Sequence, residues 1–244
     1  VLAAMIGQIG QPGGGFGLGY SAENGIGNPV KHFKWPALNQ FKNQIKDFIP
    51  VARYSDMLLN PGKNFTFNGQ TYSYPNIKLV YWAGGNPFHH QMNLSKLRKA
   101  TFKPDTIITN EIWWNSLARH ADIVLPTTTT LERNDIGFRH WEQTVSPMHK
   151  AINPVGNSKN DFDIFSLISE KLDFKKQFTE NKNEEEWLKT LWSEAKESAK
   201  ENNFYLPDFD EFWNGGFFEV LKPTHEQILT VSYTHLRAHE TMAH

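Results

Sequence analysis

Three polar segments in the middle of the sequence carry side chains that could bind a ligand, and each follows a short apolar run. The runs are residues 77–83, 106–109 and 123–125, and the polar segments begin at Gly84, Asn110 and Pro126. If the runs are neighbouring parallel strands, their carboxyl ends meet at one edge of a sheet. Loops converge at that edge and backbone N–H groups are free there, so it is where ligands bind. The spacing therefore predicts a ligand site made from these segments.

The first segment, Gly84-Gly85-Asn86, is followed by two histidines. Paired glycines allow a backbone to approach a ligand closely, and the Asn86 side chain offers both a donor and an acceptor. The alternative is a tight strand-to-helix turn in which Asn86 caps its own backbone. His89 and His90 are adjacent in the chain and point in different directions, so we do not expect them to chelate a metal ion.

The later segments supply charged side chains. The carboxylate of Glu111 could accept hydrogen bonds from a ribose hydroxyl or from the N–H groups of a guanine edge. The alternative is an acid at a helix start that binds backbone donors. Arg133 could clamp a phosphate or stack on a ring, or it could form an exposed salt bridge. Asp161, which follows Asn160 in the sequence, is predicted to be the N-cap of a helix.

Composition excludes several other kinds of chemistry. The 244 residues include 25 basic and 26 acidic side chains, so no overall positive field attracts nucleic acid. The absence of cysteine excludes disulfides, thiolate zinc sites, iron–sulfur clusters bound by this chain and a cysteine nucleophile. No apolar run is long enough to span a membrane. The glycines at 13–19 match neither the dinucleotide nor the P-loop fingerprint, and we identify no catalytic residue and no metal ligand.

The order of apolar and polar residues predicts an α/β fold. The apolar runs alternate with helix-like segments at 92–102 and 115–120, the pattern of a Rossmann-like parallel sheet flanked by helices and covered on both faces. A β-hairpin insertion is predicted at 65–74, where Asn68 and Gly69 suit the two positive-φ turn positions. Further helices are predicted at 49–59, 161–171 and 183–201, and the last has an apolar stripe of Leu188, Leu191, Trp192 and Ala195.

We expect four segments along the chain. They are a glycine-rich connecting segment at 1–48, an α/β domain at 49–175, a helical extension toward a further domain at 176–230, and a non-native tail at 231–244. The opening residues, VLAAMIG, have the pattern of the last turns of a buried helix, which predicts a chain that begins within a longer protein. The tail carries three histidines without an apolar pattern and resembles a translated sequencing adapter.

Several longer strings of residues resemble one known family. They are IGQPGGGFG at 9–17, IPVARYSDMLLNPG at 49–62, YWAGGNPFHHQ at 81–91, ARHADIVLP at 118–126, LERNDIG at 131–137 and PVGNSKNDFDIF at 154–165. Together, and in this order, they are similar to the dimethyl sulfoxide reductase family of molybdopterin oxidoreductases. The branch that the chain resembles most holds the trimethylamine N-oxide and biotin sulfoxide reductases, and the resemblance covers residues 1–220.

The resemblance implies a cofactor and the residues that bind it. Enzymes of this family use molybdenum bis(molybdopterin guanine dinucleotide), and the domain at 49–175 matches the part that holds the nucleotide of one dinucleotide. Matched by position, the cofactor-binding residues are Asn86, His90, Asn110, Glu111, Arg133 and Asp161. The serine that ligates molybdenum in this branch lies upstream of the matched part, so no residue of this chain is assigned as catalytic.

The resemblance also implies an activity. These enzymes remove an oxygen atom from a small S- or N-oxide in a two-electron reduction, in anaerobic respiration, with a cytochrome or another protein as electron donor. A periplasmic location is expected, with the cytoplasm as the alternative, and neither nucleic acid nor a membrane span is expected. Two other classes stay open: a dehydrogenase domain, which would need the missing glycine fingerprint, and a nucleotide-binding α/β module without molybdenum.

Overall fold

The computed structural model describes residues 1–8, 11, 14, 33–45, 48–138 and 144–220. The chain divides into two compact units, each made from separate stretches of sequence. The unit that we call the sheet unit comprises residues 39–133 and 150–181, and the unit that we call the Trp192 unit comprises residues 1–38, 134–149 and 182–244. All six predicted cofactor-binding residues belong to the sheet unit.

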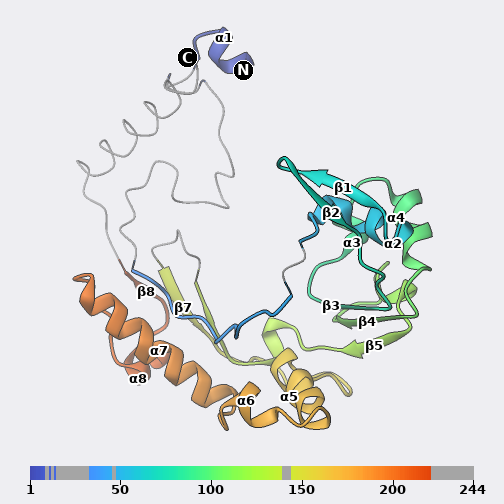
Figure 1. Cartoon of the computed structure of the whole chain (residues 1–244). Helices are drawn as coiled ribbons and strands as arrows, with labels where there is room; N and C mark the ends of the chain where they lie inside the picture. Colours follow the sequence, from blue (N-terminus) through green and yellow to red (C-terminus); the bar gives the residue numbers. More distant parts are fainter. Residues whose placement is uncertain (9–10, 12–13, 15–32, 46–47, 139–143, 221–244) are drawn as a thin grey trace. The chain divides into compact units, whose positions relative to one another are not determined.

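The sheet unit is built on a three-stranded parallel sheet (Figure 1). Its strands, in spatial order, are β3 (Leu79–Ala83), β4 (Thr106–Glu111) and β5 (Ile123–Pro126). The register pairs Ala83 with Asn110 and Glu111 with Pro126. The three apolar runs are therefore strands, as predicted, and their carboxyl ends lie at one edge. Since the loops after all three strands start there, the polar segments begin side by side.

Burial in this sheet is concentrated in the middle strand. In β4, Ile107 and Thr109 are almost fully buried, whereas Leu79 of β3 and Ile123 of β5 are about half exposed. β3 and β5 are the outer strands and each has one hydrogen-bonded neighbour. The described helices thus cover the sheet less completely than the apolar runs predicted, because a continuous apolar run does not distinguish an outer strand from a central one.

The hairpin forms as the sequence predicted. β1 (Asn64–Phe67) and β2 (Gln70–Ser73) pair antiparallel around a two-residue turn. Asn68 has a φ of 48° and Gly69 a φ of 75°, the combination that a type I′ turn requires. Phe65 packs against Tyr74 with ring centroids 4.4 Å apart, so aromatic stacking adds to the short ladder of hydrogen bonds.

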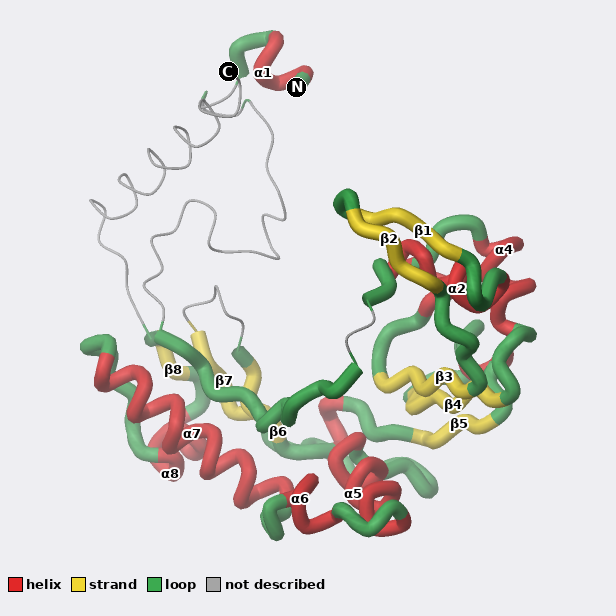
Figure 2. Tube along the Cα trace, viewed as in Figure 1, coloured by secondary structure: helices red, strands yellow, loops and turns green. Residues whose placement is uncertain are grey.

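The helices of the sheet unit are short. They are η1 (Val51–Arg53), α2 (Tyr54–Leu59), α3 (Pro87–His90), α4 (Leu94–Thr101), η2 (Ala118–His120), η3 (Thr130–Glu132), α5 (Asp161–Lys171) and α6 (Lys175–Thr179), and Figure 2 shows α5 beside α6. In α4, Leu97 and Ala100 are buried as predicted, but Met92 and Leu94 are exposed. Met92 lies outside the helix because Asn93 is its N-cap, and only the last three residues of the predicted helix at 115–120 are helical.

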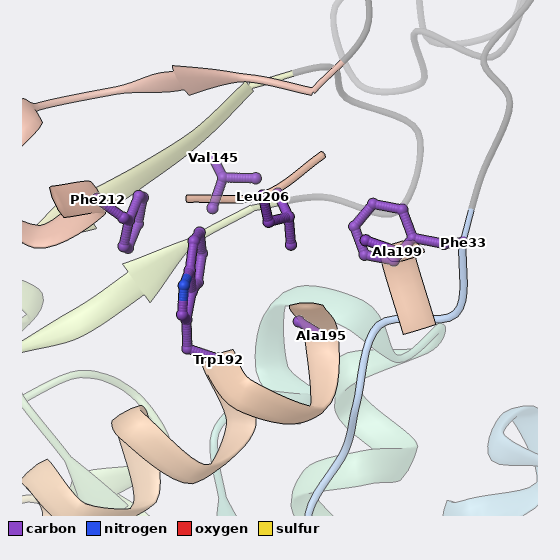
Figure 3. Close-up of a cluster of buried hydrophobic side chains, with 7 residues drawn as sticks. All are labelled: Phe33, Val145, Trp192, Ala195, Ala199, Leu206 and Phe212. Carbon is purple, nitrogen blue, oxygen red and sulfur yellow. The ribbon is translucent and has the colours of Figure 1, made fainter. Parts of the chain in front are cut away.

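The Trp192 unit has a core of aromatic and small side chains. Its elements are α1 (Leu2–Met5), β6 (Asp135–Gly137), β7 (Thr144–Met148), α7 (Glu184–Glu201), α8 (Phe209–Gly215) and β8 (Phe218–Glu219). Figure 3 shows the buried cluster around Trp192, whose ring stacks on Phe212 at 3.9 Å. Trp192 Nε1 donates to the Pro207 carbonyl at 3.0 Å. Leu188 and Ala195 are also buried and Leu191 is half-buried, which confirms the predicted stripe.

The structure tests the prediction for the start of the chain but not the prediction for its end. The opening residues do form a helix, α1, but Leu2 and Met5 are exposed, so the predicted burial is not found in this chain. Half of the glycine-rich segment, the end of the helical extension and the tail at 231–244 lie outside the described residues. Among the helices that the structure does describe, none combines the length and the apolar character that crossing a membrane requires.

Candidate functional site

The candidate site lies at the carboxyl edge of the parallel sheet. A bridge next to β5 brings the start of α5 to this edge: Thr127 pairs in parallel with Lys159. Two backbone hydrogen bonds support the bridge, from Thr128 to Lys159 at 3.1 Å and from Lys159 to Pro126 at 3.2 Å. Because α5 begins two residues after Lys159, Asp161 is held beside the ends of β4 and β5.

Asn110 and Asp161 are in direct contact at this edge. Asn110 Nδ2 donates to Asp161 Oδ1 at 2.7 Å, and the Thr127 hydroxyl makes a longer bond of 3.3 Å to the same oxygen. The hydroxyl of Tyr81 donates to Asn110 Oδ1 at 2.8 Å. Asn110 is almost completely buried, whereas Asp161 is exposed. Within the described residues no hydrogen bond reaches Asp161 Oδ2, so this oxygen is open to a ligand donor.

The N-cap of α5 is not the residue that the sequence predicted. Asn160 is the cap, and its Oδ1 accepts a 2.7 Å hydrogen bond from the backbone of Asp163. Asp161 is therefore the first residue of the helix and not its N-cap. Either residue type is a good cap, so composition alone does not choose between neighbours. The shift by one position matters, because it leaves the Asp161 carboxylate available to Asn110.

Asn86 caps a helix with its side-chain oxygen and carries, on its side-chain nitrogen, a donor that is unpaired in the described part of the chain. Its Oδ1 accepts a hydrogen bond from the backbone of Phe88 at 3.0 Å and caps α3, which confirms the strand-to-helix turn. Its Nδ2 is buried and has no hydrogen-bond partner among the described residues. Gly84 and Gly85 precede it with φ values of 80° and 77°, and a Cβ on either would meet no atom within 4 Å. The backbone here is open to a close neighbour, and an unpaired donor lies beside it.

Three other predicted residues lie near the same edge without joining the contact. Glu111 is the last residue of β4, not the first of a helix, and accepts a 2.8 Å hydrogen bond from Asn115 Nδ2. His90 ends α3 and is exposed. Arg133 is half-buried directly after η3. The alternative of a helix-start acid at position 111 does not apply, because β4 continues two residues past its apolar run.

Glu132 anchors the third loop. Its buried carboxylate accepts hydrogen bonds from the Thr129 backbone at 2.7 Å, the Thr129 hydroxyl at 2.8 Å and the Val155 backbone at 2.6 Å. The donors, led by the Thr129 and Val155 backbones, hold the pKa of Glu132 below its ordinary value. This carboxylate ties the loop after β5 to the segment that leads into α5, and thus supports the position of Asp161.

Two contributors to the site were missed in the sequence. Tyr81 and Thr127 both bond to the Asn110–Asp161 pair. The register pairs Tyr81 with Ile108, and Asn110 is two residues further along β4. Since side chains alternate along a strand, Ile108 and Asn110 share a face, which brings the Tyr81 hydroxyl within reach of Asn110. The alternation of side chains along each strand, combined with the strand order, would have predicted this contact.

A parallel sheet with open glycine backbone, amide donors and a carboxylate at its carboxyl edge is the arrangement at which α/β domains bind ligands. Residues 1–171 match the family model of the molybdopterin oxidoreductases. The chain belongs to this family. The resemblance recognised in the residue strings is thereby confirmed.

Individual relatives agree with the family. The chain is 45% identical to biotin sulfoxide reductase from Cereibacter sphaeroides over 88% of its length and 29% of the relative. It is 43% identical to trimethylamine-N-oxide reductase from Haemophilus influenzae over 87% of its length and 27% of the relative. Among solved structures, acetylene hydratase from Pelobacter acetylenicus has a TM-score of 0.45 at 16% identity, over 62% of this chain and 19% of its own. The chain spans less than a third of the length of the curated relatives it matches.

The family implies a molybdenum–pterin cofactor, and the polar groups of the edge fit a phosphate-bearing ligand of this kind. The unpaired Asn86 Nδ2 can donate to a phosphate or carbonyl oxygen. The open backbone at Gly84 and Gly85 allows a bulky group to come close. Asp161 offers a carboxylate oxygen to N–H donors. Donors for phosphate and an acceptor for a base are the two requirements of a nucleotide.

Proposed function

We propose that this chain is a segment of a molybdenum-dependent S-/N-oxide reductase, in which it holds the guanosine end of a molybdopterin guanine dinucleotide. The observation that supports this most directly is the contact between Asn110 and Asp161 at the carboxyl edge of the sheet. It joins the end of a central strand to the start of a helix, and it orients a carboxylate whose second oxygen is open.

The Asp161 carboxylate selects the base in this proposal. Guanine presents two neighbouring donors, N1–H and N2–H₂, to an acceptor-only group, whereas adenine presents one donor beside the N1 acceptor. A carboxylate opposite adenine N1 would place two acceptors against each other. Because Asn110 fixes one oxygen of Asp161, the carboxylate need not be ordered when the nucleotide binds, and little conformational entropy is lost.

Asn86, Gly84 and Gly85 contact the phosphates in this proposal. A phosphate oxygen would satisfy the buried Asn86 Nδ2 and remove the cost of an unpaired donor. Positive φ at both glycines turns the backbone tightly after β3, which lets N–H groups face an anion. Arg133, which follows the η3 turn in the third loop, adds the positive charge that a pyrophosphate needs. His90 and Glu111 are proposed as further contacts to the same nucleotide.

The cofactor, when bound, supplies the redox chemistry that removes an oxygen atom from an S- or N-oxide. The residues of this chain bind and orient it, and none of them is assigned a proton or an electron to carry. The relatives are biotin sulfoxide, dimethyl sulfoxide/trimethylamine N-oxide and trimethylamine-N-oxide reductases. We propose the same class of small oxides as substrates, a cytochrome or another protein as electron donor, anaerobic respiration as the role, and the periplasm as the location.

The test uses the full-length protein that contains this sequence. After purification, its molybdenum is measured by mass spectrometry, and the nucleotide released by acid is identified by chromatography. The proposal predicts molybdenum, a fluorescent oxidised pterin and GMP, together with reduction of trimethylamine N-oxide or a sulfoxide by a reduced dye. AMP or a nicotinamide in place of GMP would support a dehydrogenase domain, and a guanine nucleotide without molybdenum would support a nucleotide-binding module.

A further inference from the structure

Tyr81 stands out in the sheet unit because its side chain contacts both Asn110 and the helix that carries Asp161. Its hydroxyl donates to Asn110 Oδ1 at 2.8 Å. Its ring packs against Phe165 of α5, with centroids 5.4 Å apart. Phe165 lies one helical turn after Asp161 and hence on the same side of α5. Tyr81 therefore contacts β4 through its hydroxyl and the helix that carries Asp161 through its ring.

The chemistry of Tyr81, Asn110 and Asp161 fixes which group donates and which accepts in each hydrogen bond. A carboxylate can only accept, so Asn110 must turn its NH₂ group toward Asp161. The carbonyl oxygen of the Asn110 amide then faces Tyr81, which must donate its proton to that oxygen. Burial raises the pKa of Tyr81, and the negative charge of Asp161 raises it further, so the phenol keeps this proton at neutral pH.

Without the Tyr81 hydroxyl, the Asn110 amide loses the contact that fixes its direction. Its oxygen would be unpaired in a side chain that is 3% exposed, which is costly for a buried acceptor. Rotation of the amide by half a turn would place that oxygen against the Asp161 carboxylate, and the two acceptors would repel each other. Either outcome weakens the contact that holds Asp161 in place.

We propose that Tyr81 is a positioning residue for base recognition: by donating to Asn110 it fixes the direction of the Asn110 amide, which in turn orients Asp161 toward guanine. This inference rests on the proposed function, since it concerns the same nucleotide. It adds a specificity determinant that contacts neither the nucleotide nor the reacting atoms. Phe165 supports the arrangement, because it holds the Tyr81 ring against α5.

The test measures the affinities of the full chain for GMP and AMP by calorimetry and compares their ratio between variants. Tyr81→Phe keeps the ring and its packing but removes the donor. We expect the GMP-to-AMP affinity ratio to fall about tenfold, the typical effect of losing one hydrogen bond in a charge-assisted network. The matched control is Tyr72→Phe, which removes an exposed hydroxyl that donates to Gln70 in the hairpin and should leave the ratio unchanged. A ratio within one sample does not depend on the folded fraction, so partial unfolding cannot imitate the effect.

A double-mutant cycle separates this inference from the proposed function. If Tyr81 acts only through Asp161, then Tyr81→Phe should have no further effect on the ratio in an Asp161→Asn background. An unchanged ratio in Tyr81→Phe, with a lowered ratio in Asp161→Asn, would overturn the positioning role alone. An unchanged ratio in Asp161→Asn, or no GMP binding by the unmodified chain, would overturn the guanine site and the positioning role with it. A further loss in the double variant would show that Tyr81 acts by another route.

Discussion

Asn110 Nδ2 donates a 2.7 Å hydrogen bond to Asp161 Oδ1 across a separation of 51 residues in the sequence. The donor is buried at the end of the central strand and the acceptor is exposed at the start of α5. A buried amide is held by its surroundings, and it thereby fixes a carboxylate that solvent and ligands can reach. This relationship gives the sheet edge an acceptor that a buried side chain holds in place.

Replacing the Asp161 carboxylate with an amide should abolish base selection. Asp161→Asn presents a donor as well as an acceptor, so it no longer favours the two donors of guanine over adenine. We expect the affinity for GMP to fall by about tenfold to a hundredfold, in the range of a bidentate base contact, while the affinity for AMP changes little. Calorimetric titration of the full chain with each nucleotide measures both values.

Asp163→Asn is the matched control for this substitution. Asp163 lies in the same first turn of α5 and is also exposed, so its replacement changes the net charge and the helix dipole interaction in the same way. It should leave the preference for GMP intact. If both variants lose the preference equally, the effect comes from the charge at the helix start, and Asp161 has no specific role.

A side chain at Gly85 should disturb both the fold and the approach of the nucleotide. Gly85 has a φ of 77°, where an L-residue is strained by roughly 1–2 kcal/mol. In Gly85→Ala the new methyl group also projects into the open space that we assign to phosphate. We expect a lower melting temperature together with a severalfold loss of affinity for GMP, measured by thermal unfolding and calorimetry.

Gly69 provides a control with the same backbone strain. Its φ is 75° and a Cβ there would also meet no atom within 4 Å, but it lies in the hairpin turn, away from the candidate site. Gly69→Ala should lower the melting temperature by a similar amount and leave GMP affinity unchanged. Equal losses of affinity in both variants would contradict a role for Gly85 in binding.

Much of this fold could be predicted because the responsible interactions are local. The turn at Asn68 and Gly69 depends on two neighbouring φ values, and a run such as 106–109 depends on its own side chains. The apolar pattern also predicted that the strands pair in parallel, since short strands alternating with helices favour this arrangement. Parallel pairing in turn predicted which loops form the candidate site, because ligands bind at the carboxyl edge of such a sheet.

The details of the site depended on contacts between distant residues and could not be predicted in the same way. Asn160 caps α5, while Asp161 binds Asn110, which lies far away in the sequence. A helix start at Glu111 stayed open as an alternative because the end of β4 is set by pairing with β5 and not by hydropathy. The hydroxyl of Tyr81 became relevant only once the strand register was known.

The lowered pKa of Glu132 makes stability depend on pH in the acid range. Because the folded-state pKa lies below the ordinary value of 4.5, the unfolded chain binds the proton more readily. The stabilisation is therefore fully present above about pH 4.5 and is lost as the pH falls through the folded-state pKa. Glu132→Gln should lower the melting temperature by a few degrees near neutral pH, and the difference from the unmodified chain should shrink as the solution is acidified.

Glu194→Gln is the control for this pH series. Glu194 is exposed on α7, so its replacement should leave the melting temperature nearly unchanged at every pH. Thermal unfolding is followed by circular dichroism at several values between about pH 3 and pH 7, the range in which carboxylates titrate. It gives the melting temperature of each variant as a function of pH. A constant difference between Glu132→Gln and the unmodified chain over this range would argue against a buried ionised carboxylate.

The core of the Trp192 unit should be sensitive to a conservative change. Trp192→Phe removes part of the stack on Phe212 and the hydrogen bond to the Pro207 carbonyl. We expect the free energy of unfolding to fall by about 2–4 kcal/mol, from a cavity and an unpaired buried carbonyl. The same change at Trp113, which is 69% exposed, should cost less than about 0.5 kcal/mol. Urea unfolding measures both, and equal effects would mean that Trp192 is not part of a packed core.

The most direct test of the account is a crystal structure of the chain with GMP bound. We expect guanine N1 and N2 to lie within about 2.7–3.2 Å of the Asp161 carboxylate oxygens, while Asn110 keeps its hydrogen bond to Oδ1. The phosphate should lie beside Gly84, Gly85 and Asn86. A guanine base held by other side chains, with the Asp161 carboxylate in solvent, would contradict the account.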